Sequence, residues 1–177
     1  MEHTLFYAGQ ALGAIIVILG FINYQVKTRK SLLFVNLATT VGFTLQYLCL
    51  GGWSGVAMNI VSVIRNYVFY LLEQKGKKPK QSLVITFAII IGAIGVLTSI
   101  FSKEGLYFIL MVVALMIRSY TIAFSNPNHI RIGILITSPM IIIYNFYLLA
   151  FGGIVYEAVV VISSIIGFIR FRKNRTI

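Results

Sequence analysis

Apolar residues along this chain form runs of about 20 residues separated by short polar segments. A helix of that length crosses the hydrocarbon core of a bilayer once. We therefore expect an all-α integral membrane protein, built as one membrane domain over residues 1–177. Seven transmembrane helices are predicted, over residues 5–25, 32–50, 53–72, 83–101, 105–124, 130–149 and 153–171.

The connections between these runs predict how they are grouped. Gly51 and Gly52 join the second and third runs, and residues 151–153 (Phe-Gly-Gly) join the sixth and seventh, so both pairs should be tight hairpins. A long lysine-rich loop instead leads into the fourth run, which carries no charge and few polar groups. We therefore expect two triple-helix bundles joined by a linker helix. The predicted boundaries are residues 1–73 for the first bundle, 83–101 for the linker helix and 105–172 for the second bundle.

Composition supports the membrane class, with 59% hydrophobic and 11% charged residues, because soluble domains are only about half apolar. The net charge of +11 does not indicate a nucleic-acid partner, since the basic residues lie in clusters between apolar runs. The first residues lack the basic region and cleavage site of a signal peptide, so we expect the first run to remain as a helix. Cys49 is the single cysteine and is expected to be a small buried apolar residue.

The distribution of lysine and arginine predicts the orientation. Twelve of the 15 fall on one side of the membrane if the chain crosses seven times, and only Lys103 falls in a loop on the other side. Cytoplasmic loops are enriched in basic residues, so the N-terminus is expected outside and the C-terminus inside. The twelve are Lys27, Arg29, Lys30, Lys75, Lys77, Lys78, Lys80, Arg131, Arg170, Arg172, Lys173 and Arg175.

A weak internal repeat relates the two predicted bundles. A shift of about 98 residues superposes identical residues, for example Thr39 on Thr137 and Gly55 on Gly153. The same shift places Asn59 on Glu157, so two polar groups within apolar runs share one position. Four crossings separate equivalent runs, and the two bundles should therefore have the same orientation, as parallel repeats require.

The first bundle contains Gln25, Thr28 and Ser31 around the first basic loop and Asn59 in its third run. This pattern resembles the PQ-loop, or SWEET-like, triple-helix unit, although Tyr24 occupies the position of the motif's proline. Over the whole chain, Tyr144-Asn145, Gly153, Glu157 and Arg170 are similar to the YgjV-type proteins of the bacterial inner membrane. The resemblance implies the inner membrane, a SWEET-like arrangement of three, one and three helices, and a substrate pocket lined by Asn59. Within this framework we expect hinges at Gln25 and at Pro139, which is the one proline inside a predicted span.

Glu157 is the one carboxylate within a predicted span, and intramembrane carboxylates usually mark a cavity or a functional site. It is a candidate for binding substrate or a proton, although it lies about one turn into its helix, where the helix dipole alone favours an anion. Asn59 is a candidate to bind a polar substrate or to join neighbouring helices by a hydrogen bond. Gln46, Tyr144 and Asn145 fall in the outer thirds of their runs. They are candidates to line a vestibule or, for the tyrosine, to anchor at the membrane interface.

Two arginines lie within predicted spans. Both Arg65 and Arg118 are close enough to the inner ends to extend to the cytoplasmic surface, and we expect this for Arg118. Arg65 could equally form an anion-attracting wall of a cavity. A salt bridge from either one to Glu157 would have to span about 10–13 Å along the helix axis, which disfavours it.

These residues predict a carrier or facilitator for a small polar solute, sugar-like or vitamin-like, that works by alternating access between the two bundles. The alternative is a membrane scaffold, lipid-binding or sensor protein that transports nothing. An enzyme is disfavoured because the chain has no aspartate and its two histidines, His3 and His129, fall on opposite sides of the membrane. No metal-ligand spacing and no cofactor motif are present. The basic loops are expected to attract anionic lipid at the cytoplasmic face.

Overall fold

The computed structural model describes residues 2–25, 28–101, 107–123 and 127–173, and this part of the chain is helical apart from short connections. The seven predicted helices are present in the predicted order. Their bounds are α1 Glu2–Gln25, α2 Arg29–Leu50, α3 Trp53–Gln74, α4 Gln81–Phe101, α5 Tyr107–Thr121, α6 Pro127–Tyr147 and α7 Phe151–Lys173.

The outer surface of the helices has the character of a lipid-facing surface. Helices α1 to α4 are each long and apolar enough to cross a membrane, and α5, α6 and α7 contribute shorter apolar stretches within the described residues. Large apolar side chains point outward along the helices, and Ile18, Ile89 and Ile166 are each more than half exposed. Such a continuous apolar surface would be unfavourable in water. The chain is therefore an integral membrane protein.

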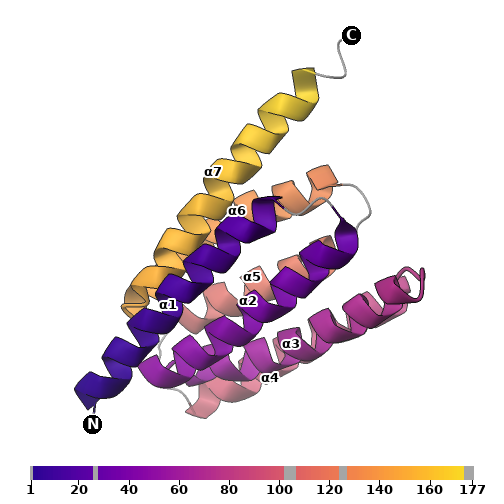
Figure 1. The fold of residues 1–177 in the computed structure, drawn as a ribbon. Helices are drawn as coiled ribbons and strands as arrows, with labels where there is room; N and C mark the ends of the chain where they lie inside the picture. Colours follow the sequence, from indigo (N-terminus) through magenta and orange to yellow (C-terminus); the bar gives the residue numbers. More distant parts are fainter. Residues whose placement is uncertain (1, 26–27, 102–106, 124–126, 174–177) are drawn as a thin grey trace.

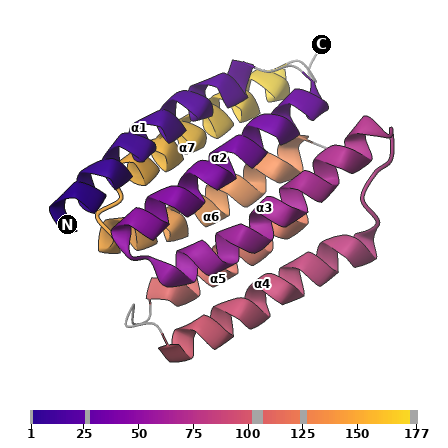
Figure 2. The ribbon, with the colours of Figure 1, turned by 60° about the horizontal axis from the view of Figure 1, so that its bottom comes forward.

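Six of the helices form two layers of three (Figures 1 and 2). One layer contains α1, α2 and α3, and the other contains α7, α6 and α5, with neighbours in each layer packed in chain order. The layers meet along two edges, where α1 packs on α7 and α3 packs on α5. Helix α4 lies outside this closed arrangement and packs against α3 and α5 (Figure 2). The six helices thus form two facing layers, and α4 covers one of the two edges from outside.

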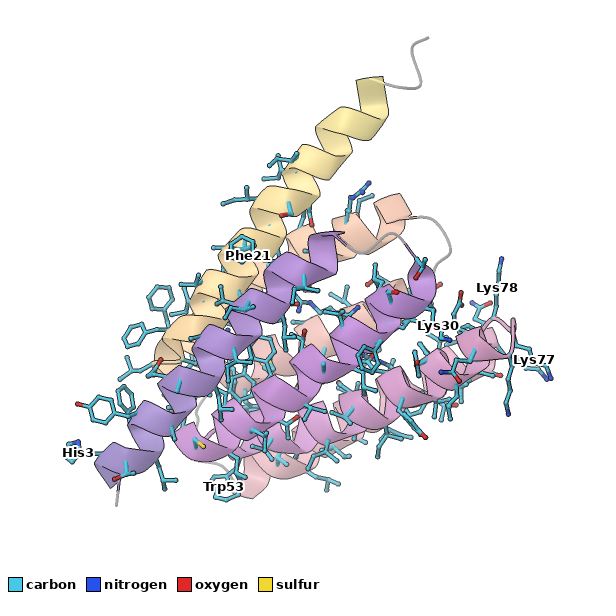
Figure 3. The ribbon with its side chains drawn as sticks, in the orientation of Figure 1. His3, Phe21, Lys30, Trp53, Lys77 and Lys78 are labelled. Carbon is cyan, nitrogen blue, oxygen red and sulfur yellow. The ribbon has the colours of Figure 1, made fainter. Side chains whose placement is uncertain are left out.

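Charged and aromatic residues distinguish the two ends of the bundle. Lys30, Lys77 and Lys78 lie together at one end, whereas His3 and Trp53 lie at the other (Figure 3). We refer to the first as the basic end and to the second as the N-terminal end. The grouping of these three lysines agrees with the charge pattern from which the orientation was predicted.

The edge between α1 and α7 is formed by direct contact of two backbones. A β-carbon added to Gly152 would lie 2.2 Å from the Cα atom of Gly13, and one added to Gly13 would lie 2.9 Å from the Cα atom of Gly152. Such distances leave no room for any side chain at either position. Gly13 therefore permits close helix packing, and its partner is a glycine first expected to form a turn.

The turn between α6 and α7 differs from the prediction in its position. It lies at residues 148–150, between Tyr147 and Phe151, and both predicted turn glycines lie in the first turn of α7. The left-handed conformation is adopted by Leu149, with a φ of 53°. The turn was predicted at the glycines because a leucine in this conformation costs about 1–2 kcal/mol. Here the glycines are needed instead for helix packing, and a hydrogen bond from the Gln10 side chain to the carbonyl oxygen of Leu149 holds the turn.

This turn repeats the turn between α2 and α3. Gly51, 98 residues before Leu149, also has a positive φ, of 78°. The amide of Gly52 donates to the carbonyl oxygen of Tyr47, and the amide of Ala150 donates in the same way to that of Asn145. Both bonds are 2.9 Å long. The shift found in the sequence therefore relates two turns with the same hydrogen bonding, although only one of them uses glycine.

Candidate functional site

A cavity of about 320 Å³ lies between the two layers. This volume is at the lower end of the range for small-molecule sites in proteins. Its lining combines apolar side chains with a high proportion of polar ones, contributed by α2, α3, α5, α6 and α7. The polar and charged members are Asn36, Thr39, Thr40, Asn59, Ser62, Arg65, Asn66, Arg118, Thr121, Arg131, Glu157, Ser163 and Ser164.

Glu157 forms an ion pair with Arg118 across the cavity wall. The two terminal guanidinium nitrogens of Arg118 donate to the two carboxylate oxygens of Glu157 at 2.9 and 2.6 Å. The Ser138 hydroxyl donates to Glu157 Oε2 at 2.6 Å, and Arg118 Nε donates to the Thr137 hydroxyl at 3.0 Å. Glu157 is 1% exposed. Helices α5, α6 and α7 are therefore joined through one buried carboxylate whose two oxygens both accept charged hydrogen bonds.

The expectation that Arg118 extends to the membrane surface is therefore wrong. The salt bridge to Glu157 was disfavoured because of an axial offset of about 10–13 Å. In the structure Glu157 lies six residues after the first residue of α7, and Arg118 lies eleven after the first residue of α5. If these helix ends are level, the offset is about five residues, or roughly 8 Å. The long arginine side chain spans that distance and contacts the carboxylate directly. On α6, the hydroxyl group of Thr137 accepts a hydrogen bond from Arg118, and that of Ser138 donates one to Glu157.

Arg65 also lines the cavity and is held by Asn66 of its own helix and by Ser119 of α5. Its side chain is buried, with 4% exposure. Nε and one terminal nitrogen donate to Asn66 Oδ1 at 3.2 and 3.0 Å, and the other terminal nitrogen donates to the Ser119 hydroxyl of α5. Asn66 in turn donates to the Thr40 hydroxyl of α2 at 2.9 Å. Of the two roles left open by the sequence, the structure places Arg65 in the cavity wall and not at the surface.

Asn59 and Glu157, which coincide under the sequence repeat, both line the cavity. Asn59 is 4% exposed, and its Nδ2 group has no hydrogen-bond partner within the described part of the chain. A buried amide nitrogen without a partner is costly. Asn59 lines the cavity, but the Nδ2 atom itself is buried, so a rotation of the amide is needed before this donor meets a water molecule or a ligand.

Buried aromatic rings and amide groups from both layers of helices pack together beside the cavity, on the side of the N-terminal end. The Tyr47 hydroxyl donates to Asn145 Oδ1 at 2.7 Å, and the Gly55 amide donates to the Tyr144 hydroxyl at 3.1 Å. The Tyr47 and Tyr144 rings pack edge to face, with centroids 5.6 Å apart. We call Tyr47, Gly55, Tyr144 and Asn145 the closing layer. It joins the two layers of helices, since two of these residues belong to α6 and the others to α2 and α3.

The vestibule residues predicted from the sequence lie in or beside this layer. Gln46, Tyr144 and Asn145 are fully buried and do not line the cavity. Both polar atoms of the Gln46 amide lack a hydrogen-bond partner among the described residues. The sequence placed these residues correctly near one end of the bundle. It could not distinguish a position lining the cavity from one packed behind the aromatic rings.

The predicted hinge residues are placed only in part. Pro139 lies within α6, directly after the Ser138 that contacts Glu157, and it has no amide hydrogen to complete the helix. The side chain of Gln25 lies outside the described part of the structure. Thr28, which resembles the loop motif, caps α2, because its hydroxyl accepts a hydrogen bond from the Ser31 amide at 3.1 Å.

Comparison with known proteins decides the family. The family model Imp-YgjV, described as a bacterial inner membrane protein, matches residues 7–175, which is nearly the whole chain. The chain belongs to the Imp-YgjV family. It is accordingly a multi-pass protein of the bacterial inner membrane. No curated protein matches, and no solved structure matches.

In this Imp-YgjV protein, sequence reasoning missed several residues of the site. The hydroxyl groups of Thr137 and Ser138 were not singled out, although two adjacent hydroxyl residues beside the one proline within a span are an unusual group. Arg118 was assigned to the surface. The predicted spans, however, contain two arginines, Arg65 and Arg118, and a single carboxylate, Glu157. That charge inventory was the available signal for an ion pair. Among the described residues, no three His, Cys, Asp or Glu side chains lie close enough to hold a metal ion.

Replacement of Tyr47 by phenylalanine is expected to lower the free energy of unfolding by about 1–2 kcal/mol, because it leaves Asn145 Oδ1 buried without a donor. Asn145 Nδ2 already has no partner among the described residues, so the amide could not compensate. The measurement is unfolding in mixed micelles followed by circular dichroism. Tyr156→Phe is the matched control, since the Tyr156 hydroxyl makes no hydrogen bond within the described structure and should cost less. Equal losses in both variants would contradict this role of the closing layer.

Proposed function

We propose that the chain is a membrane carrier for a small polar solute, which binds in the cavity between two helix triplets and crosses by alternating access. The observation that carries the proposal is a polar cavity lined by both Asn59 and Glu157, which come from different triplets. A scaffold would have no need of such a space, and tight apolar packing at these positions would have favoured that alternative.

In this proposal the triplets are α1–α3 and α5–α7, with α4 as the linker helix, in the SWEET-like arrangement that the sequence resembles. The repeated turns at Gly51 and Leu149 support a parallel repeat. So does the contact of Tyr47 with Asn145, because these residues are equivalent under the 98-residue shift. Equivalent residues of a parallel repeat meet where a pseudo-twofold axis passes between the triplets. Binding sites of repeat transporters lie near such an axis.

The orientation proposed is N-terminus outside, with the basic end in the cytoplasm. The cavity extends from below the closing layer towards the basic end, where Leu32, Ile122 and Arg131 belong to its lining. The closing layer would then separate the cavity from the outside. Opening to the outside would require the contacts from Tyr47 to Asn145 and from Gly55 to Tyr144 to break.

Glu157 takes a different part in this mechanism from the one first expected. Both of its oxygens are occupied by Arg118 and Ser138. We therefore assign to Glu157 the positioning of Arg118 at the cavity wall, where about a fifth of the arginine side chain is accessible. Asn59, whose amide donor has no described partner, is the better candidate for direct contact with the solute.

The test is solute uptake into proteoliposomes by a protein with one cysteine in the cavity. In a Cys49→Ala background, Ser62→Cys places a thiol in the cavity wall, and Ile64→Cys places one on the exposed apolar face of the same helix. We expect uptake of one class among sugars, vitamins, amino acids and organic acids, relative to empty liposomes. A charged methanethiosulfonate reagent should abolish this uptake in Ser62→Cys and leave Ile64→Cys unaffected. Absence of uptake for every class would reject the carrier and favour a sensor or scaffold.

A further inference from the structure

The charges that line the cavity are unbalanced. Arg65 and Arg118 belong to its lining, against the single carboxylate of Glu157. The sequence has only four acidic residues and no aspartate. Glu73, the other acidic residue whose side chain is described, lies near the end of α3 and is not part of the lining. The cavity wall therefore carries a net positive charge.

One positive charge of the lining, that of Arg65, is balanced by no described carboxylate. Arg65 is 4% exposed, and its hydrogen-bond partners are the neutral groups of Asn66 and Ser119. The described part of the chain gives it no carboxylate partner, since Glu157 is held by Arg118. A buried guanidinium without a counter-charge is unfavourable unless an anion accompanies it.

The surroundings of Arg65 also fix its orientation. Asn66 donates to the Thr40 hydroxyl and accepts from Arg65 Nε. The Ser119 hydroxyl of α5 accepts from a terminal nitrogen of Arg65. Arg65 donates two hydrogen bonds to Asn66 and one to Ser119, which use three of its five guanidinium N–H groups. The other two N–H groups have no partner in the described part of the chain, and Arg65 lines a cavity whose wall also contains the unpartnered amide donor of Asn59. A rigid arginine fork with free donors matches a carboxylate or phosphate oxygen pair.

We propose that the solute of this cavity is a small organic or inorganic anion and that Arg65 binds its charged group. The inference rests on the proposed carrier function and narrows its substrate from a polar solute to an anion. Asn59 would donate a further hydrogen bond from its Nδ2 group. Arg118 would contribute positive charge but remain tied to Glu157. Neutral sugars would leave the charge of Arg65 uncompensated and should bind weakly.

The experiment measures thermal stabilisation of the purified full-length protein by matched pairs of compounds. Each acid is compared with its neutral amide, as in lactate and lactamide, succinate and succinamide, and nicotinate and nicotinamide, with inorganic phosphate added as a further anion. Potassium chloride holds the ionic strength constant. We expect at least one anion to raise the melting temperature in a saturable way while its amide does not.

Arg65→Gln should weaken that binding about 10- to 100-fold, and Arg65→Lys should retain part of it, because a lysine keeps the charge but loses the planar fork. Lys77→Gln removes one positive charge at the exposed basic end and serves as the control for net charge. Without ligand, Arg65→Gln should melt no lower than the wild type, since it removes an uncompensated buried charge. A marked loss of stability in ligand-free Arg65→Gln, with unchanged anion binding, would make Arg65 a structural link between α3 and α5 and overturn the inference.

Uptake by proteoliposomes separates this inference from the carrier proposal. If a neutral solute is transported and Arg65→Gln transports it equally well, the carrier stands and the anion assignment fails. Saturable binding of an anion that depends on Arg65, without uptake, leaves the anion site in place and rejects the carrier. If no compound binds or crosses, both proposals are rejected.

Discussion

Glu157→Gln is expected to lower the free energy of unfolding by roughly 3 kcal/mol, at the lower end of the range for breaking a buried ion pair. The side chain keeps its shape, but Arg118 loses its only described carboxylate partner and Ser138 loses an acceptor with a full charge. The lower end applies because 22% of the Arg118 side chain is accessible. The measurement is unfolding of the purified protein in mixed micelles.

Two further variants identify the cause of the loss. Glu73→Gln removes a partly exposed carboxylate near the end of α3, outside the cavity lining, and should lower the free energy of unfolding less than Glu157→Gln does. Arg118→Met combined with Glu157→Gln should be less destabilised than the sum of the two single variants, because it leaves no isolated buried charge. Strict additivity, or equal losses from Glu157→Gln and Glu73→Gln, would show that the ion pair does not hold α5 to α7.

Gly152→Ala is expected to cost at least about 3 kcal/mol, which is large for the addition of one methyl group. The new β-carbon would lie 2.2 Å from the Gly13 Cα atom and 2.4 Å from the Gly13 carbonyl carbon. These are backbone atoms, so no change of rotamer relieves the contact, and α1 must move away from α7. The expected result is a lower melting temperature together with loss of the monodisperse folded protein on size exclusion.

Gly92→Ala provides the matched control within the same fold. Its β-carbon would meet the Met116 sulfur at 3.0 Å, and that side chain is flexible enough to move. Alanine also favours a helix over glycine by roughly 0.5–1 kcal/mol. Gly92→Ala should therefore be neutral or slightly stabilising. If both glycine variants behaved alike, close packing between α1 and α7 would not be the reason for Gly152.

The sequence was sufficient for features that depend on the length and composition of single segments. Apolar runs define all seven helices, and the 98-residue shift found in the sequence relates the turns that the structure shows at Gly51 and Leu149. The position of the second turn was mistaken because a glycine can serve either conformation or packing. At Gly152 the deciding fact is the approach of Gly13, which lies 139 residues earlier in the chain.

The site depended on relations between helices, and these were only partly accessible. Asn59, Arg65 and Glu157 were recognised as polar residues in apolar surroundings, and all three line the cavity. The pairing of Arg118 with Glu157 depends on how deeply α5 and α7 lie relative to each other. The predicted starts of the two helices, at residues 105 and 153, each lie two residues away from Tyr107 and Phe151, and together these differences were enough to disfavour the pair.

The two edges at which the layers meet are not mechanically equivalent. Along α1 and α7 the glycine backbones touch directly, and Tyr156 packs at the site of Gly20 further along. Along α3 and α5 the described polar contact is the hydrogen bond from Arg65 to Ser119, with α4 packed over both helices. Sliding or separation at the first edge would expose backbone, whereas the second can exchange one polar partner for another. This asymmetry favours a rotation about the edge between α1 and α7 that opens the edge between α3 and α5. Arg65, which we propose binds the solute, lies at the edge that opens.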